Sequence, residues 1–306
     1  MENTLKKYWY RITDKKKYQI YRNKINKEKE LKSFKENLEK YINDVQKKIG
    51  SKKTLAFLHS GTSGDVINAL PVIKELSKTH KCTLYLQVEK PYTNNHPNNY
   101  CPYLLPEHLF KMLIPLLRSQ DYLLGVKKFE NQEIDINLDK FREFPVSLQF
   151  DNLRYYFHVS GIQPDVLIPY LNVGPHEKMK NKIVIHRTFR YTNHLINYNF
   201  LESYKDLIFI GTKKEFDHLK KSVKNLEFYN CKDHLEMAMI IKSSRFLIGN
   251  SSIGHAIAEG LKTPRILEAS PEFPAAYPHG KDAYDFYFQN HFEKWCSYLE
   301  NKYKKK

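Results

Sequence analysis

The chain has few cysteines, and none of them has the short spacing of a metal or redox motif. Its 306 residues contain four, at Cys82, Cys101, Cys231 and Cys296, too scattered for a disulfide framework or a zinc site. Reduced thiols in a cytoplasmic protein are the expectation. No apolar run approaches the roughly 18 residues of a membrane span, and the N-terminus lacks the apolar core of a signal peptide.

Acidic residues are scarce relative to basic ones, and the formal net charge is +16. The excess is uneven, because residues 1–50 hold 15 Lys and Arg against 7 Asp and Glu. Such a segment suits a phosphate-rich partner: an anionic membrane face, a nucleic acid or a polyanionic glycan. A solvated, lysine-rich helix is the other interpretation. No RNA or DNA motif is present, so no specific nucleic-acid partner is expected.

The second half of this basic segment has the spacing of an amphipathic helix. Apolar side chains recur at intervals of three, four and seven, at Leu31, Phe34, Leu38, Tyr41, Ile42, Val45 and Ile49. This stripe must lie against something, and docking onto the first domain that follows is favoured over insertion into a membrane. Residues 1–50 are therefore expected to form a basic helical extension.

The most informative stretch is 55–71, which reads L-A-F-L-H-S-G-T-S-G-D-V-I-N-A-L-P. A strand is expected at Thr54–His59, a small turn at Ser60–Gly64, and a helix at Val66–His80. A strand, a glycine-bearing turn and a helix make the geometry in which backbone N–H groups at a helix start face a ligand. Asp65 stands at this helix start, where the helix dipole favours its charge.

A second stretch of the same kind lies in the other half of the chain. A strand is expected at Arg245–Gly249, a polar turn (N-S-S-I-G) at 250–254, and a helix at Gly254–Leu261. Strands and helices alternate around both turns, which predicts parallel sheets with right-handed crossovers. The expected fold class is therefore α/β, with two Rossmann-like domains that face a cleft.

Composition divides the chain into four parts. Prolines and glycines between Gly161 and Lys182 mark the connection between the two domains. The expected parts are the extension at 1–50, a first Rossmann-like domain at 51–172, a second at 173–288, and a C-terminal helix with a basic tail at 289–306. Within the first domain, weaker signals indicate a long loop at 90–106 and a helix at 146–159.

Both turns resemble those of a known family. Residues 61–74, G-T-S-G-D-V-I-N-A-L-P-V-I-K, resemble the first turn and helix of the ADP-heptose:lipopolysaccharide heptosyltransferases, which often read G-D-x-x-x-x-x-P here. Residues 235–264 are similar to that family's helix, strand and D-T-G-x-x-H-x-x-A-A turn. Asn250, Ser251 and Ser252 replace its Asp, Thr and Gly, and His255 matches its His. The resemblance implies the two-domain GT-B fold and an inverting, metal-independent glycosyltransferase of polysaccharide biosynthesis.

Inverting sugar transfer needs a base for the acceptor hydroxyl and donors for the departing diphosphate. Asp65 is expected as the general base, a role that the resemblance also implies, and helix capping is the other interpretation of this residue. His59, at the end of the preceding strand, is the alternative base. The first domain is expected to receive the acceptor, with a turn made of His59, Gly61, Thr62, Ser63 and Gly64.

The second domain is expected to bind the nucleotide sugar, with the diphosphate at the N-S-S turn. A basic side chain in the loop after strand 182–186 is expected to hold the leaving diphosphate, with Arg190 slightly preferred over Arg187. Glu259 is expected either to bind a ribose hydroxyl or to lie exposed on its helix. The full set of donor residues is Arg187, Arg190, Gly211, Thr212, Lys213, Asn250, Ser251, Ser252, Gly254, His255 and Glu259. No metal or other cofactor is required, because protein groups supply both the base and the phosphate ligands.

Two other functions stay open beside this heptosyltransferase-like activity. The N-S-S turn and its distance to Pro264 also resemble UDP-N-acetylglucosamine 2-epimerases, although Ser63 and Gly64 replace the Arg-Pro of their first turn. A non-catalytic module that binds a glycan or polyanion is the other, and Asn250 in place of Asp favours it. The expected partners of the transferase are a nucleotide sugar, a glycan or lipid-linked acceptor, and an anionic inner membrane face that the cytoplasmic protein contacts peripherally.

Overall fold

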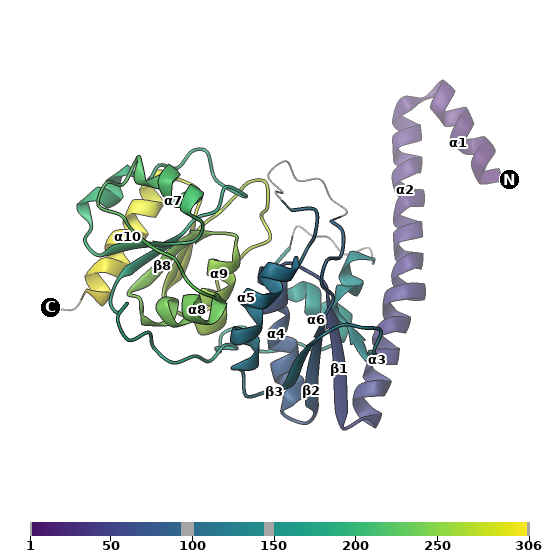
Figure 1. Cartoon of the computed structure of the whole chain (residues 1–306). Helices are drawn as coiled ribbons and strands as arrows, with labels where there is room; N and C mark the ends of the chain where they lie inside the picture. The colour runs from purple at the N-terminus through teal and green to yellow at the C-terminus, as the bar shows by residue number, and fades with distance from the viewer. Residues whose placement is uncertain (1, 93–100, 144–149, 305–306) are drawn as a thin grey trace.

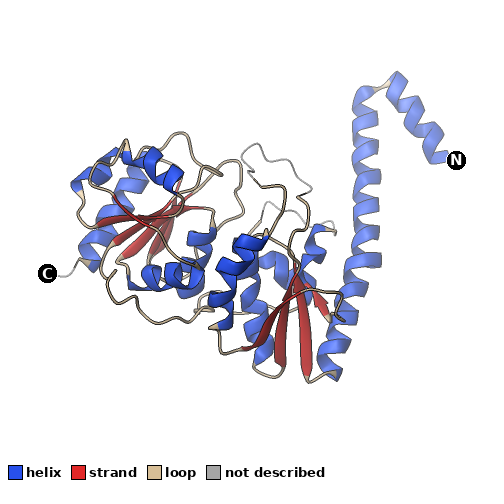
Figure 2. Ribbon diagram, viewed as in Figure 1, coloured by secondary structure: helices blue, strands red, loops and turns tan. Residues whose placement is uncertain are grey.

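The structure, a computed structural model, describes residues 2–92, 101–143 and 150–304 (Figure 1). Two parallel sheets, each flanked by helices, form two α/β domains, and a long helical extension stands beside the first (Figure 2). The expected fold class, two Rossmann-like domains with an N-terminal helical extension, is therefore confirmed.

The first sheet has the order β3-β2-β1-β4, and its strands are all parallel. They are β1 (Thr54–His59), β2 (Lys81–Leu86), β3 (Leu123–Lys128) and β4 (Ile136–Asn137). The chain moves outward from β1 to β3 and then places β4 on the free side of β1. The strand order thus reverses between β1 and β4, and ligands of open α/β sheets bind at the carboxyl ends of such a pair.

The second sheet repeats this plan with six parallel strands in the order β10-β9-β8-β5-β6-β7. They are β5 (Ile183–His186), β6 (Leu207–Ile210), β7 (Glu227–Tyr229), β8 (Phe246–Asn250), β9 (Arg265–Glu268) and β10 (Ala283–Phe286). Strand β10, four residues at the edge of the sheet, was not expected from the sequence. The order reverses between β5 and β8, which places the second switch point beside the N-S-S turn.

Helices cover both sheets. They are α4 (Ser63–Ser77), α5 (Glu107–Arg118), α6 (Arg154–Ser160), α7 (Lys213–Lys220), α8 (His234–Ser243), α9 (Ile253–Leu261) and α10 (Gln289–Tyr303), with short 3-10 turns at Leu138–Arg142 and Asn199–Ser203. Helix α6 begins later than the predicted helix at 146–159, whose first residues, 146–149, lie outside the described chain. The middle of the predicted loop at 90–106 lies outside it as well.

The second sheet is buried on both faces. In β5, Ile183 and Ile185 join a core with Phe292 of α10, whereas Val184 joins the core formed with α8 and α9. Strands of this kind read as continuous apolar runs, which is why the sequence predicted them well. The core beneath α8 and α9 continues into that of the first domain, and α4 packs along α9. The two domains therefore share one apolar seam.

The extension consists of α1 (Glu2–Thr13), α2 (Lys15–Ser33), a π-helical segment (Phe34–Glu39) and α3 (Lys40–Ser51). Only its second half docks. Leu38 and Val45 are 1% exposed in the first-domain core, and the hydroxyl of Tyr41 donates to the backbone oxygen of Asn137 at 3.0 Å. The expected docking onto the first domain is confirmed for this part of the stripe.

The first half of the extension does not dock. Leu31 and Phe34, which belong to the predicted stripe, are 58% and 44% exposed, and α2 buries none of its residues. Figure 1 shows α2 rising past the first domain and α1 turning away at its far end.

Candidate active site

The turn after β1 and the turn after β8 meet at the seam between the domains. A methyl group placed on Gly64 would lie 3.9 Å from the backbone nitrogen of Ile253, the first residue of α9. Helices α4 and α9 begin at this place and pack along each other (Figure 1). The structure thus brings together two segments far apart in the sequence. A side chain at Gly64 would only just reach van der Waals distance of α9, so the glycine keeps the two helix starts close without filling the space between them.

Asp65 takes part in a capping box at the start of α4. Thr62 is the N-cap residue, and its backbone N–H donates to Oδ2 of Asp65 at 3.0 Å while its hydroxyl accepts from the N–H of Asp65. Oδ2 also accepts from Arg142 at 3.3 Å, and the side chain is 36% exposed. Among the described residues, the hydrogen bonds and the ion pair of this carboxylate all use Oδ2. The carboxylate therefore caps the helix and is partly accessible at the same time.

Two charged residues beside Asp65 escaped the sequence analysis. Arg142 pairs with Asp65 and also donates to Oδ1 of the buried Asp139 at 2.5 Å, and Asp139 accepts from the hydroxyl of Ser60 as well. Burial by itself raises the pKa of Asp139, but the Arg142 guanidinium and the Ser60 hydroxyl hold it below its usual value. These residues follow β4, whose pairing with β1 brings them to the first switch point.

His59 is fully buried, and both of its ring nitrogens are engaged. Nδ1 accepts the backbone N–H of Gly61 at 2.8 Å, so Nε2 carries the proton and lies 3.1 Å from the hydroxyl of Tyr156. Burial lowers the pKa of His59, and the ring is neutral. A Cβ on Gly61 would lie 2.5 Å from this ring and 2.7 Å from the Cβ of Asp65, so only glycine fits there. The structure places His59 beneath the turn, as a support for it.

Ser63, the remaining residue of the acceptor-side turn, begins α4 as a buried side chain. Its hydroxyl has no hydrogen-bond partner among the described residues. An unpartnered hydroxyl at a domain seam offers a contact to a polar ligand group.

In the second domain, Asn250 is a buried clamp on the loop that follows β5. Its Nδ2 donates to the backbone oxygens of Thr188 and Arg190 at 2.8 and 2.7 Å, and its Oδ1 accepts the N–H of Thr188 at 3.0 Å. Only an amide can donate and accept in this way. The structure therefore explains why Asn stands at this position, and it places the side chain within the loop rather than toward a ligand.

The start of α9 has no side-chain cap. Ser252 is the N-cap residue, but its hydroxyl donates to the oxygen of Asn250 at 3.0 Å and lies 2.9 Å from Nδ1 of His186. No acidic residue occurs in the first turn. A Cβ on Gly254 would lie 2.6 Å from the His186 ring, so only glycine allows this packing. The backbone N–H groups of this turn stay available to an anion.

Arg187 and Arg190 occupy different environments. The Arg187 guanidinium forms two hydrogen bonds with the fully buried Glu268, at 2.6 and 2.9 Å, and Glu268 also accepts from the hydroxyl of Tyr198. Arg187 therefore ties the loop to β9. The Arg190 guanidinium lies 5.2 Å from the ring centre of Tyr191.

Tyr191, in the loop after β5, lies close enough to Asp65 of the first domain to be affected by its charge. It has a positive φ of 55° and stacks on Phe273 with ring centres 4.7 Å apart. Burial raises the pKa of Tyr191, and the Asp65 carboxylate adds to that increase while Arg190 opposes it. Sequence reasoning missed this residue, because nothing in the local pattern places the loop after β5 against the turn after β1.

Glu259 and His255 lie on the buried side of α9. Glu259 is 2% exposed and accepts from Arg265 at 2.9 Å and from Lys262. Burial by itself raises the pKa of its carboxyl, but the His279 ring, Arg265 and Lys262 together hold this pKa well below its usual value. The exposed position considered for Glu259 is therefore wrong. Burial lowers the pKa of His255 to about 3, and Nδ1 of this neutral ring has no partner among the described residues.

The turn after β6 forms a second capping box. Thr212 caps α7 with Glu215, whose Oε2 accepts from the Thr212 hydroxyl at 2.7 Å and from its N–H at 3.1 Å, directly after Gly211. Lys213 pairs with Asp217 on the same helix, and its side chain is 64% exposed. These residues lie at the carboxyl edge of the second sheet but are engaged with one another.

Within residues 2–92, 101–143 and 150–304, no group of three or more His, Cys, Asp and Glu side chains is arranged to hold a metal ion. In the same ranges no helix combines the length and the apolar character needed to cross a membrane.

No protein-family model matches the chain, and no curated protein matches its sequence. Solved structures do match its fold. E. coli ADP-heptose lipopolysaccharide heptosyltransferase II gives a TM-score of 0.55 at 8% identity, over 82% of this chain and 99% of that one. E. coli heptosyltransferase WaaC, solved with ADP, gives a TM-score of 0.55 at 10% identity, over 80% of this chain and 99% of that one. A family 9 glycosyl transferase from Veillonella parvula gives a TM-score of 0.51 at 11% identity, over 82% of this chain and 92% of that one.

These matches confirm the expected resemblance to heptosyltransferases at the level of three-dimensional structure. At 8% to 11% identity they show a shared GT-B-type fold. What the chain does has to be argued from its own residues.

Proposed function

We propose that this chain transfers a sugar from a nucleotide-diphosphate sugar to a hydroxyl of a glycan or lipid-linked saccharide. The observation that carries the proposal is the meeting of two unlike helix starts at one seam. Helix α9 begins without a cap, whereas α4 begins with the accessible carboxylate of Asp65. The uncapped start of α9 is suited to bind a phosphate, and the Asp65 carboxylate is suited to accept a proton. WaaC, which shares the fold, was solved with ADP and with an ADP-sugar analogue, which supports this class of donor.

In this proposal the donor diphosphate meets the first turn of α9. The backbone N–H groups of Gly254 and His255 and the hydroxyl of Ser251 are the contacts, and the helix dipole favours the negative charge that develops as the diphosphate leaves. Because Glu268 holds Arg187, we assign to Arg190 the role of countercharge. Asn250 acts indirectly, by fixing the backbone of the loop that carries Arg190.

The acceptor is proposed to lie beside Asp65. Its hydroxyl gives a proton to Oδ1 while its oxygen attacks the anomeric carbon from the face opposite the diphosphate. The bond between that carbon and the phosphate oxygen breaks, the nucleoside diphosphate leaves with the electron pair, and the sugar inverts. Arg142 holds the other oxygen of Asp65 and thereby orients the carboxylate.

A panel of ADP-, GDP-, UDP- and CMP-sugars, assayed by thermal shift on the full chain, tests donor binding. A ligand at about 100 times its Kd stabilises the native state by roughly 2.7 kcal/mol, enough to raise Tm measurably. One nucleotide class should raise Tm, and its nucleoside diphosphate alone should retain much of the effect. The stabilising sugar is then incubated with and without acceptor saccharides, and release of the nucleoside diphosphate is measured.

The same experiment separates the alternatives. An epimerase converts UDP-N-acetylglucosamine with no acceptor, whereas a transferase releases nucleoside diphosphate only when an acceptor is present. If no nucleotide sugar raises Tm and the chain binds polyanions in a salt-sensitive manner, the non-catalytic module replaces the transferase.

A further inference from the structure

We infer that α1 docks on the surface of an anionic lipid bilayer. This inference rests on the extension alone and does not depend on the sugar-transfer proposal. Helix α1 stands at the far end of α2, away from both sheets, and α2 buries none of its own residues (Figure 1). The end of the extension thus presents its surface outward.

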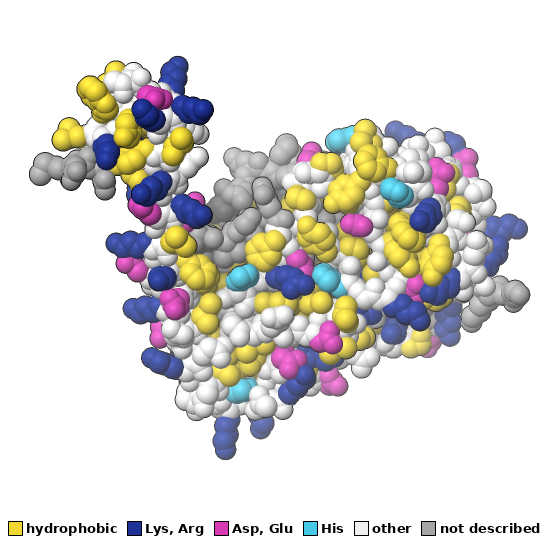
Figure 3. All heavy atoms as spheres, turned by 180° about the vertical axis from the view of Figure 1, so that it is seen from behind, with side chains coloured by type: hydrophobic (Ala, Val, Ile, Leu, Met, Phe, Trp, Pro, Cys, Tyr) yellow, Lys and Arg dark blue, Asp and Glu magenta, His cyan; other side chains and the backbone are white. Residues whose placement is uncertain are grey.

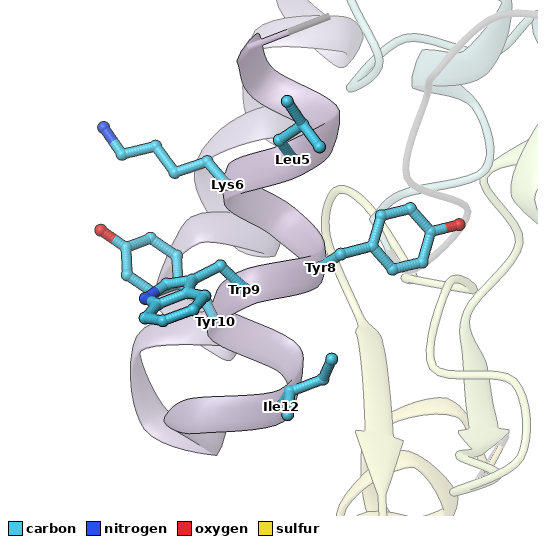
Figure 4. Close-up of a pocket in the computed structure, with 6 residues that line it drawn as sticks. All are labelled: Leu5, Lys6, Tyr8, Trp9, Tyr10 and Ile12. Atoms are coloured by element: carbon cyan, nitrogen blue, oxygen red, sulfur yellow. The ribbon is translucent and has the colours of Figure 1, made fainter.

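One face of α1 is apolar and exposed. Leu5, Tyr8, Trp9 and Ile12 recur at intervals of three, four and seven, and they are 71%, 57%, 66% and 84% exposed. Figure 4 shows these side chains projecting from the helix rather than folding back on the chain. Leaving two aliphatic and two aromatic side chains in water is unfavourable, so the face calls for an apolar environment.

Basic residues flank this face. Lys6, Lys7 and Arg11 lie among the other residues of α1, and Lys15–Lys17 follow directly at the start of α2. Figure 3 shows the resulting pattern, an apolar cluster bordered by Lys and Arg side chains. A short helix with aromatic and aliphatic side chains on one face and lysines around it is the form that lies in the interface of an anionic bilayer.

The junction between α1 and α2 allows α1 to lie along a bilayer surface. Asp14 caps α2 by accepting the N–H groups of Lys16 and Lys17, both at 3.0 Å, and this cap separates α1 from α2. Helix α1 can then lie flat while α2, roughly 28 Å long at 1.5 Å per residue, stands between the bilayer and the domains. With 12 residues, α1 is itself far too short to cross a bilayer.

The face fits two other occupants less well. A second copy of the chain would bring two equally basic segments together, and four side chains fall well below the roughly 20 to 30 residues that each partner of a specific interface contributes. A nucleic acid suits the lysines, but bases stack on aromatic rings, and Leu5 and Ile12 offer none. Hydrocarbon is the environment that suits all four side chains together.

The test uses the full chain and two kinds of vesicle, phosphatidylcholine alone and phosphatidylcholine with about one-third phosphatidylglycerol. Flotation and tryptophan fluorescence are measured together, since Trp9 is one of only two tryptophans and the other, Trp295, stacks on Tyr284. We expect binding to be about tenfold or more tighter on the anionic vesicles, weaker at high salt, and accompanied by a blue shift. Trp9→Phe should bind but lose the shift.

A matched pair of double variants assigns the binding to α1. Leu5→Ser with Ile12→Ser should weaken it about tenfold or more, because both aliphatic side chains leave the face. The control, Ile20→Ser with Leu31→Ser, makes the same chemical change at exposed positions of α2 and should bind like the native chain. Circular dichroism confirms that both variants remain folded.

Three results would overturn the inference. The first is equal binding to neutral and anionic vesicles, or none to either. The second is a native-like affinity of the Leu5/Ile12 variant. The third is a dimer in vesicle-free sedimentation, or binding to single-stranded RNA, that the same variant abolishes, since a second copy or a nucleic acid would then be the occupant of this face.

Discussion

The turn after β1 and the turn after β8 have the same topology and opposite chemistry. Each follows the central strand of a switch point and opens a helix at the same seam. In the first, Thr62 and Asp65 form a capping box in which each side chain accepts the backbone N–H of the other residue. In the second, the Ser252 hydroxyl turns inward to Asn250 and His186, and the start of α9 is left uncapped.

This difference shows that topology alone does not specify an anion site. A capped helix start with a carboxylate in its first turn repels a phosphate, whereas an uncapped start with no acidic residue in its first turn accommodates one. The difference therefore supports the proposed division, with the phosphate at the second domain and the proton acceptor at the first.

The largest effect is expected for Asp65→Asn. The amide oxygen can still accept the N–H of Thr62, so the cap of α4 is kept while the base is lost. Turnover should fall by roughly 10² to 10⁴, in line with loss of a general base, while donor affinity stays within about twofold. Steady-state kinetics and donor titration measure the two separately.

Asp14→Asn is the matched control for Asp65→Asn, since Asp14 also caps a helix but lies far from the seam. Its turnover should equal that of the native chain. Native turnover in the Asp65 variant would remove this residue as the base.

A strong effect on stability is expected for Asn250→Asp. The carboxylate cannot donate to the oxygens of Thr188 and Arg190, and it is buried against both. The free energy of unfolding should fall by about 3 kcal/mol, because a charge and two carbonyls lose their partners together. Chemical denaturation measures this, with the exposed Asn197→Asp as control. If the variant were as stable as the native chain, Asn250 would not be the clamp described here.

Ser252→Asp would give the second turn the chemistry of the first. An acidic cap at α9 occupies the N–H groups and repels the donor phosphates, so donor affinity should fall roughly ten- to a hundredfold. Ser252→Asn is the matched control, because it also caps the helix and loses the same hydroxyl but carries no charge. The Ser252→Asn variant should bind the donor more tightly than the Ser252→Asp variant, and isothermal titration calorimetry measures both affinities. Equal affinities would show that no anion binds at α9.

A smaller effect concerns the bridge that holds the two domains together. His279 lies 3.0 Å from Asp151 of the first domain and 3.4 Å from Glu259 of α9. Burial by itself lowers the pKa of His279, but these two carboxylates raise it to about 9. The folded pKa exceeds the ordinary 6.5, so the stabilisation is complete below pH 6.5 and is lost as the pH rises through 9.

Deprotonation of His279 should therefore lower the free energy of unfolding of the native chain by roughly 2 kcal/mol between pH 7 and about 9.5, allowing for partial exposure of the ring. His279→Gln should be less stable at pH 7 and lack this loss. Denaturation across that pH range measures both, with the exposed His291→Gln as control. An identical pH dependence in the native chain and the His279 variant would show that the bridge does not stabilise the seam.

Local patterns were enough to predict the strand–turn–helix units. The apolar run of β8 and the small polar turn before α9 determine their own conformations. The predicted bounds of β8 and α9 therefore agree with the structure to within one or two residues. The edge strand β10 was missed, because its four residues gain strand geometry only by pairing with β9. Arg142 was missed for a related reason: it reaches Asp65, 77 positions away, only because β4 pairs with β1.

The sequence by itself determined the elements, because hydrophobic period, glycine position and capping residues act over a few neighbouring residues. It therefore predicted the two domains, the two turns and the basic extension. Only the tertiary structure decided how the side chains are used: Glu268 engages Arg187, Asn250 clamps a loop, and half of the extension stays exposed. These contacts join side chains to groups that are distant in the sequence, so they form only when the whole chain has folded.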